Sequence, residues 1–209
     1  MVTGKFEFMS IDADEDEHSI EMQLPYIAKV MEPARGNFTI VPVMVGSLSP
    51  SSEAKYGKIF AKYLKVLIII CFIFYMNMLI ISLLQDPSVC FVISSDFCHW
   101  GDRFHYTHYD STQGEIHQSI KVKRISSIDI VCNKVNILEQ ALDHAGMDII
   151  ERMDPQGFTA YLKQFGNTIC GRHPIGVFLN MVAEIRPSLT NGHTMDLKFL
   201  KYAQSSQVS

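Results

Sequence analysis

The chain has 209 residues, of which 47% are hydrophobic, so it is long and apolar enough for one domain with a sizeable core. Its formal net charge of −4 at pH 7 offers no basic surface, and we therefore exclude nucleic acid as a partner. Five cysteines without a Cys-x-x-Cys pair argue against a disulfide scaffold and a zinc finger, and they favour a reducing compartment. Residues 1–16 contain no apolar signal sequence, so we expect a cytoplasmic protein.

The first predicted element is a helix over residues 18–31. An acidic run, residues 12–17, precedes it and suits the first turn, where negative charge meets the positive end of the helix dipole. The same run can be read as a cation site, although a solvated helix start is the commoner use of such a cluster. Pro25 is expected to kink this helix or to end its first part.

Two apolar runs predict buried strands, and a helix is expected after the first of them. The runs are residues 38–45 (FTIVPVMV) and residues 89–93 (VCFVI). Between them, Ser49 offers an N-cap and Pro50 a first helical residue for a helix that extends to about residue 64. Strands of this kind alternating with helices predict an α/β fold with a largely parallel sheet.

One segment breaks the globular pattern. Residues 66–84, from Val66 to Leu84, contain no charged side chain and are about long enough to span a bilayer as a helix of roughly 20 residues. Four lysines precede the segment and Asp86 follows it, so a span would leave the N-terminal side in the cytoplasm. The alternatives are a single-pass membrane protein and a buried core segment.

Three further helices are predicted in the last third of the chain, over residues 141–153, 158–165 and 174–185. The third shows the clearest recurrence of apolar residues at helical spacing. Cys170 and Gly171 are therefore expected just outside its N-terminus.

Two short polar motifs carry the candidate chemistry. Asp96 and His99 follow the predicted strand at residues 89–93, and in parallel α/β sheets sites form beyond the carboxyl ends of strands. His99 suits a metal ligand or a general base, and Asp96 suits the group that orients it. The thiol of Cys170, near a helix N-terminus, suits a metal ligand or a nucleophile. The bland alternatives are an inert cysteine and an Asp-x-x-His spacing that arises by chance.

The sequence resembles the Memo family, named for mediating receptor-driven cell motility, whose fold is similar to that of class III (LigB-type) non-haem iron extradiol dioxygenases. The resemblance extends over nearly the whole chain. The matching stretches are DEDEHSIEMQLPY (14–26), FTIVPVMVGSLS (38–49), VISSDFCHWGDRF (92–104), YDSTQGEI (109–116), NTICGRHPIGV (167–177) and KYAQSSQ (201–207).

The resemblance implies an incomplete LigB-like fold, with a mixed or parallel sheet flanked by helices and the N-terminal half missing. The family's metal-type pocket has two histidines and a cysteine where the enzymes use two histidines and a glutamate. Cys170 matches that cysteine, His99 matches the acid/base histidine of the enzymes, and Asp96 is its neighbour in the pocket. The two histidine ligands belong to motifs in the missing half. The His-Ala-Gly at residues 144–146 lies in a predicted helix in the wrong region, and we interpret it as chance.

The function implied by the resemblance is a signalling or adaptor protein that binds phosphorylated receptor peptides or signalling adaptors. Copper or iron is implied for the complete parent protein, and no stable metal binding is expected for this chain. Two alternatives remain open. One is a metal-dependent redox enzyme of the extradiol dioxygenase class. The other is a thiol enzyme with Cys170 as nucleophile, His99 as base and Asp96 as the orienting group. Without a complete metal site we do not expect enzyme activity of the dioxygenase type.

Two segments interrupt the resemblance, residues 66–85 and 122–140. Each segment begins with valine, whose codons start with GT, and ends with glutamine, one of whose codons is CAG, so the two ends match the GT and AG edges of an intron. The final Val208-Ser209 can likewise be the translation of a third intron that begins after Gln207. We predict a single partial domain over residues 1–209, in which these two segments are the translation of two retained introns. Sequencing transcripts across both segments tests this, and predominance of transcripts that carry both would refute it.

Overall fold

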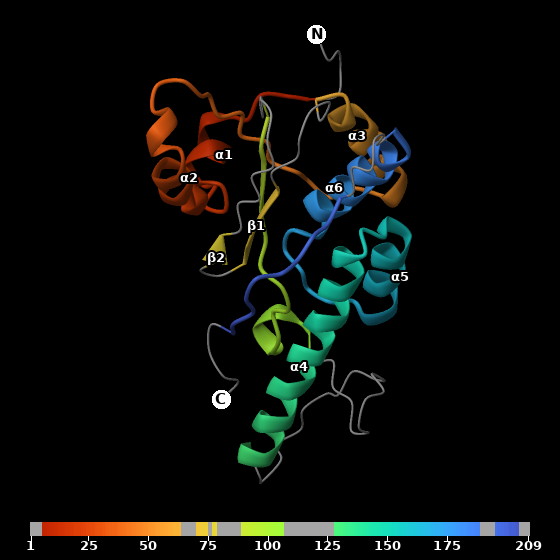
Figure 1. The fold of residues 1–209 in the computed structure, drawn as a ribbon. Coiled ribbons are helices and arrows are strands. Elements are labelled where there is room, and N and C mark those ends of the chain that lie inside the picture. Colours follow the sequence, from red (N-terminus) through yellow and green to blue (C-terminus); the bar gives the residue numbers. More distant parts are fainter. Residues whose placement is uncertain are drawn as a thin grey trace. The chain divides into compact units, whose positions relative to one another are not determined.

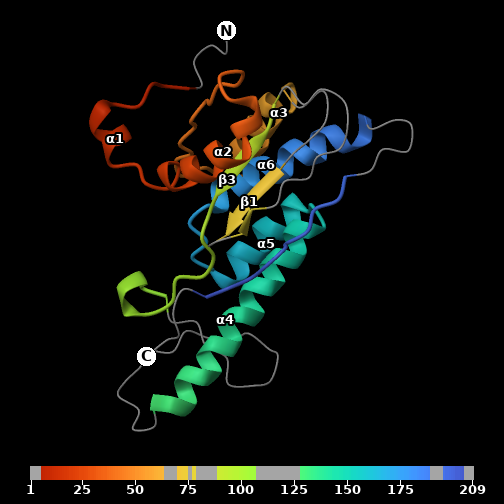
Figure 2. The same cartoon turned by 60° about the vertical axis from the view of Figure 1, so that its left-hand side comes forward.

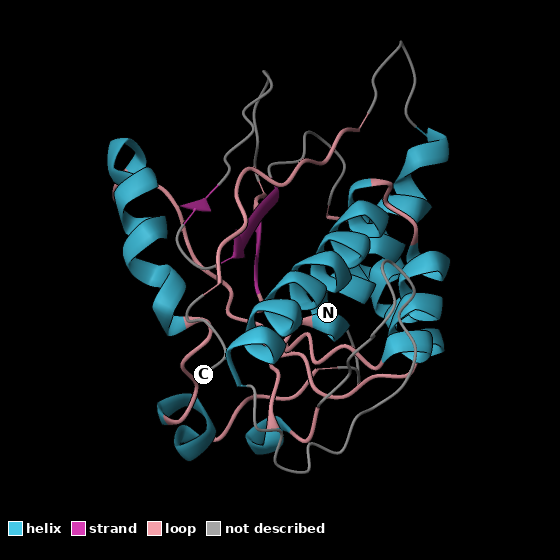
Figure 3. Cartoon of the chain, turned by 90° about the horizontal axis from the view of Figure 1, so that it is seen from below, coloured by secondary structure: helices cyan, strands magenta, loops and turns pink. Residues whose placement is uncertain are grey.

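The computed structural model describes residues 6–63, 70–74, 77–78, 89–106, 128–188 and 195–204. Helices predominate over strands in these parts of the chain (Figure 3). The contacts divide the chain into two compact units, residues 1–44 and residues 45–209, and each is described here by itself.

The first unit contains two short α-helices and two 3-10 turns. Their bounds are α1 Ile11–Glu15, η1 Glu21–Gln23, α2 Leu24–Val30 and η2 Glu32–Ala34.

The single helix expected over residues 18–31 is therefore divided, and the acidic run forms a helix of its own. The carboxylate of Glu17 is the physical reason, because it accepts hydrogen bonds from the backbone N–H groups of Ser19 and Ile20 at 2.7 and 2.8 Å. These bonds replace helical ones and start a new turn. Pro25 lies in the first turn of α2, where a missing N–H costs no hydrogen bond, so it begins a helix rather than ending one.

The buried strand predicted over residues 38–45 is wrong. This segment has no ladder partner among the residues that the structure describes, and its apolar side chains are exposed, Val41 by 80% and Met44 by 49%. An apolar run forms a strand only where a neighbouring strand satisfies its backbone groups, and no described segment does so here.

The second unit begins with α3, Pro50–Ala61, which confirms the helix predicted from Ser49 and Pro50. The Ser49 side chain accepts a hydrogen bond from the Ser52 N–H at 3.2 Å, as an N-cap should. The helix ends three residues earlier than expected.

A small mixed sheet follows, in the order β2-β1-β3. The strands are β1 Ile70–Phe74, β2 Asn77–Met78 and β3 Phe91–Ser94. β1 is parallel to β3, with Ile70 opposite Phe91, and antiparallel to β2 (Figure 2). The strand predicted over residues 89–93 is thus confirmed with a shift of its bounds. The described ranges combine many helices with this one small sheet, so they contain both helices and strands but little strand, and a larger LigB-like sheet is not seen in them.

Both β1 and β2 lie within residues 66–85, the segment considered above as a membrane span or an insert. Runs of β-branched and aromatic residues favour extended structure, which accounts for β1. The rest of that segment lies outside the described residues. No helix in the described ranges is long and apolar enough to cross a membrane.

Three helices complete the unit: α4 Ile128–Glu151, α5 Pro155–Phe165 and α6 Arg172–Ile185 (Figure 1). α5 and α6 contain the helices predicted over residues 158–165 and 174–185, and α4 ends two residues before the predicted end at residue 153. α4 starts well before residue 141, inside the proposed insert at 122–140. α5 is capped by Asp154, whose carboxylate accepts from the Gly157 N–H at 2.9 Å, and it ends at Gly166 with a left-handed φ of 61°. Short 3-10 turns occur at Asp102–Phe104 and Arg186–Ser188.

The hydrophobic core of this unit gathers side chains from β3, α4, α5 and α6. α6 contributes the largest share, five of the fifteen buried side chains of this cluster, because its apolar residues recur at helical spacing. α3 packs against α6. The two helices approach closely at Gly57, where an added Cβ would lie 2.7 Å from the Cβ of Asn180. The largest fully buried side chains are Phe158, Phe178, Ile150, Ile169, Ile175, Leu179, Met181 and Val182.

Candidate functional site

Two loops of the second unit meet where the polar motifs of the sequence lie. The strand-end loop, residues 95–100, directly follows β3, and the pre-helix loop, residues 167–171, connects α5 to α6. Asp96 and His99 therefore lie beyond the carboxyl end of a strand, and Cys170 lies before the N-terminus of a helix, as the sequence predicted. The chemical roles assigned to these three residues stay predictions.

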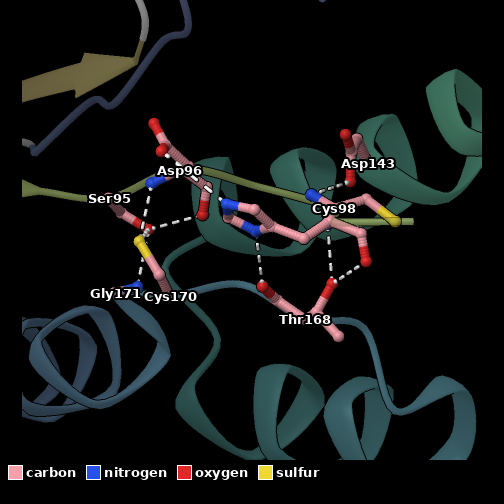
Figure 4. Close-up of polar contacts among 8 residues, drawn as sticks. Ser95, Asp96, Cys98, Asp143, Thr168, Cys170 and Gly171 are labelled. Atoms are coloured by element: carbon pink, nitrogen blue, oxygen red, sulfur yellow. Dashed lines mark hydrogen bonds and ion pairs between the residues drawn. The ribbon is translucent and has the colours of Figure 1, made fainter. Parts of the chain in front are cut away.

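Cys170 and Asp96 are in direct contact (Figure 4). The Asp96 backbone N–H donates to Cys170 Sγ at 3.0 Å, and the Cys170 N–H donates to the Asp96 carbonyl oxygen at 3.2 Å. This reciprocal pair joins residues 74 positions apart in the sequence. Cys170 is exposed as a residue, and the hydrogen bond from the Asp96 N–H holds its sulfur in place.

His99 is fixed by Thr168 of the pre-helix loop. The His99 N–H donates to Thr168 Oγ1 at 2.6 Å, and Thr168 Oγ1 donates to the His99 carbonyl oxygen at 2.8 Å. The His99 ring nitrogen Nδ1 lies 3.1 Å from the Thr168 carbonyl oxygen. Because a carbonyl oxygen only accepts, Nδ1 is the donor in this contact. In the neutral ring Nε2 then carries the lone pair. Nε2 lies 3.8 Å from Asp96 Oδ2, a distance suited to an ion pair once the imidazole is protonated.

The two loops approach so closely that the residue after Cys170 has no room for a side chain. The Gly171 N–H donates to Ser95 Oγ at 2.9 Å, and a Cβ on Gly171 would lie 2.5 Å from that same oxygen. Ser95 Oγ in turn donates to the Asp96 carbonyl oxygen at 2.9 Å. Ser95 therefore acts as a bridge between the loops, and its hydroxyl is engaged with backbone groups.

A buried carboxylate, Asp143 of α4, supports both loops from behind. Asp143 Oδ1 accepts from the Cys98 N–H at 3.2 Å and from Asn167 Nδ2 at 3.1 Å, and its Oδ2 accepts from the Tyr202 hydroxyl at 2.9 Å. Burial raises the pKa of Asp143, and these hydrogen bonds together with the charge of His144 offset part of the rise. Burial likewise raises the pKa of Tyr161, whose hydroxyl accepts from Asn167 Nδ2.

A largely buried ion pair joins α3 to α6. His173 Nδ1 is 2.8 Å from Glu53 Oε1 of α3, and only 16% and 9% of the two side chains are exposed. Burial raises the pKa of Glu53, while the hydrogen bond and charge of His173 and the charge of Arg172 oppose that rise. This pair joins α3 to the first turn of α6, directly beyond Cys170.

The arrangement does not form a complete metal site in the part of the chain that is described. No three His, Cys, Asp or Glu side chains there lie close enough together to hold a metal ion. Cys170 supplies one sulfur ligand and His99 one lone pair, so the donors present do not fit a three-ligand copper or iron centre by themselves.

Sequence reasoning missed Asp143 and Glu53. Asp143 carried a readable signal, since it occupies the same helix face as Met147 and Ile150, both buried. A carboxylate on an apolar stripe requires partners. Glu53 gave no such signal, because it lies in the first turn of α3, where acidic residues are common for other reasons.

Comparison with known proteins identifies the family. A family model described as Memo-like protein matches residues 1–74 and 72–209. The chain belongs to the Memo-like family. It is 49% identical to Protein MEMO1 of Homo sapiens over 205 residues, and 50% identical to Protein MEMO1 of Danio rerio over the same length. It is 42% identical over 206 residues to the Protein memo-1 homolog of Caenorhabditis elegans.

These alignments cover nearly all of the Memo-like chain but only part of its relatives. They include 98% of this chain and 55% of the human protein, and 99% of this chain and 47% of the nematode protein. The chain therefore spans about half the length of the curated relatives it matches. Both site loops lie within the matched residues 72–209.

Proposed function

We propose that this chain is the site-bearing part of a cytoplasmic Memo-like signalling protein, linked to cell motility, whose partners are phosphorylated receptor peptides or signalling adaptors. Membership of the Memo-like family supports this proposal. The incomplete LigB-like fold belongs to the same proposal.

The observation that carries the site assignment is the exposed residue Cys170, whose sulfur accepts a hydrogen bond from the Asp96 N–H next to the Asp96–His99 pair. We assign Cys170 as one ligand of a copper or iron site, with Asp96 and His99 as neighbouring acid/base groups. Because the described donors do not complete such a site, the other ligands belong to the complete protein. A bound metal would supply redox chemistry there, and this chain's contribution is one thiolate.

A titration with Cu(I) and Fe(II), followed by ultrafiltration and metal analysis, tests the assignment of Cys170. The complete parent protein, which carries the further ligands, is compared with its Cys170→Ala and Cys90→Ala counterparts. Cys90→Ala removes a different exposed thiol. We expect Cys170→Ala to lower the amount of retained metal and Cys90→Ala to leave it unchanged. Equal retention by all three, or none by any, overturns the assignment.

Binding to immobilised phosphotyrosine-bearing receptor peptides, with the unphosphorylated peptides as controls, tests the signalling role. Retention of the chain only on the phosphorylated peptides supports the proposal. Equal or absent retention contradicts it.

A thiol enzyme is the second candidate, and one observation favours it. Cys170 is exposed, and Asp96 contacts it through the backbone while facing His99 through the side chain. Labelling with iodoacetamide at neutral pH distinguishes this candidate. A nucleophile activated by His99 should react faster than Cys90 in the same sample and should lose that advantage in His99→Gln.

A further inference from the structure

One oxygen atom of Asp143 holds both loops of the site. Oδ1 accepts from the backbone N–H of Cys98, the residue before His99, and from the side chain of Asn167, the residue before Thr168. These donors lie one position ahead of the two residues that bond to each other across the loops. Because both loops bond to the same oxygen, that oxygen fixes the distance between the loops. It also fixes which residues of one loop lie opposite which residues of the other.

The carboxylate itself is held rigidly. Asp143 is 3% exposed and lies on α4, whose neighbouring residue Leu142 accepts a hydrogen bond through its carbonyl oxygen from the Tyr161 hydroxyl at 2.9 Å. Asn167 Nδ2 also donates to that Tyr161 hydroxyl, at 2.6 Å. On the other side, Tyr202 donates to Oδ2. The bond from Tyr161 to Leu142 joins α5 to α4, and the Tyr202 hydroxyl bonds to Oδ2, so these two contacts hold the carboxylate in place without a residue of either loop.

We propose that Asp143 is a positioning residue for the site, which aligns the strand-end loop with the pre-helix loop so that the Asp96 N–H reaches Cys170 Sγ and His99 faces Asp96. The inference rests on the proposed function only in taking these two loops as the site. The geometry of Asp143 itself does not depend on what the site binds.

Replacing Asp143 by asparagine distinguishes a role of its oxygen in positioning the loops from a role of its negative charge. Both loop donors use Oδ1, and an asparagine at residue 143 retains one oxygen that accepts both bonds, while its amide faces Tyr202. The raised pKa of Asp143 agrees with this reading, because burial makes the negative charge a cost rather than the purpose of the residue. Asparagine should therefore preserve the alignment, and alanine should lose it.

Hydrogen–deuterium exchange of the full chain tests the proposal, with Asp143→Ala, Asp143→Asn and Tyr202→Phe compared with the wild type. Peptides that cover residues 95–99 and 167–171 report the hydrogen bonds between the loops. We expect exchange there to be about tenfold faster in Asp143→Ala and close to wild type in Asp143→Asn. Tyr202→Phe removes the bond to Oδ2 and retains both loop bonds to Oδ1, so it is the matched control and should leave these peptides protected.

Peptide-resolved labelling of Cys170 gives a second readout, with exposed Cys90 as the internal standard in each sample. The ratio of the two rates should change in Asp143→Ala and be restored in Asp143→Asn. If Asp143→Ala leaves the ratio and the exchange unchanged, or if Asp143→Asn behaves like Asp143→Ala, the positioning role is refuted. If Asp143→Ala does not fold, Asn167→Ala removes one of the two links. Faster exchange in both peptides, residues 95–99 and 167–171, is then the expected result, because each peptide carries donors of the bonds between the loops. Unchanged exchange in both peptides refutes the role.

Failure of this inference is distinguishable from failure of the proposed function. Loss of metal retention in Cys170→Ala together with an unaffected Asp143→Ala refutes the positioning role alone. Loops that separate in Asp143→Ala although Cys170→Ala retains metal normally refute the ligand assignment alone.

Discussion

Among the polar side-chain contacts of the second unit, the buried Glu53–His173 pair should make one of the largest contributions to the free energy of unfolding. The perturbation is Glu53→Ala, which removes the partner of His173 Nδ1 at 2.8 Å. Nδ1 then loses its partner, and Nε2, which is also buried, already has none among the described residues. Both ring nitrogens of a buried imidazole would be unsatisfied.

The magnitude follows from two opposing terms. A hydrogen bond that involves a charged group contributes about 1.5–3 kcal/mol, and a buried polar atom left without a partner adds to the loss. Removing a carboxylate that burial disfavours returns part of this free energy. We therefore expect Glu53→Ala to lower the free energy of unfolding by about 2 kcal/mol. With an m value of about 2 kcal/mol per M, the midpoint of urea unfolding shifts down by about 1 M.

The assay is urea unfolding at neutral pH, followed by circular dichroism. Glu184→Ala is the matched control, because Glu184 pairs with Lys58 at 4.0 Å while 48% of its side chain is exposed, and its loss should cost less than about 0.5 kcal/mol. Glu53→Gln, which retains an acceptor oxygen, should fall between the two. If Glu53→Ala costs no more than Glu184→Ala, or if its effect adds to that of His173→Ala without coupling, the reasoning is refuted.

Three further predictions follow from the described contacts. Gly57→Val should destabilise the chain by about 1–3 kcal/mol, because its Cβ meets Asn180 at 2.7 Å, whereas Gly46→Ala, in open space, should be nearly neutral; thermal unfolding distinguishes them. Ser49→Ala should cost about 1 kcal/mol through the lost cap of α3, measurable by urea unfolding, and an effect near zero would contradict the capping geometry. Burial raises the pKa of Asp143 in the folded chain above the value of about 3.9 in the unfolded chain. The contribution of Asp143 to the free energy of unfolding is therefore fully present below about pH 3.9 and is lost as the pH rises through the folded pKa. Wild type should therefore lose stability relative to Asp143→Asn as pH rises from about 4, and a constant difference between pH 4 and 8 would argue against it.

The elements that the sequence predicted well are those with local signals. The Ser49 cap with Pro50, and the apolar periodicity of α6, are properties of a few consecutive residues, and both helices form as expected. The run at residues 38–45 has an equally strong local signal and forms no described strand, because a strand depends on a partner that the run itself cannot specify.

The placement of the candidate site divides in the same way. Asp96 after β3 and Cys170 before α6 were predictable, since each lies at the boundary of an element with a clear pattern. The contact between them was not predictable from spacing, because 74 residues separate them and no local rule links the two loops.

By itself, the sequence determined the helices with strong local signals, such as α3 and α6, the positions of the reactive side chains along the chain, and the family to which the chain belongs. Only the tertiary structure decided that Asp143 and Glu53 are buried supports rather than surface charges. The physical reason is that a carboxylate acquires its role from the donors around it, and Cys98, Asn167 and His173 reach these two groups only once the helices have packed.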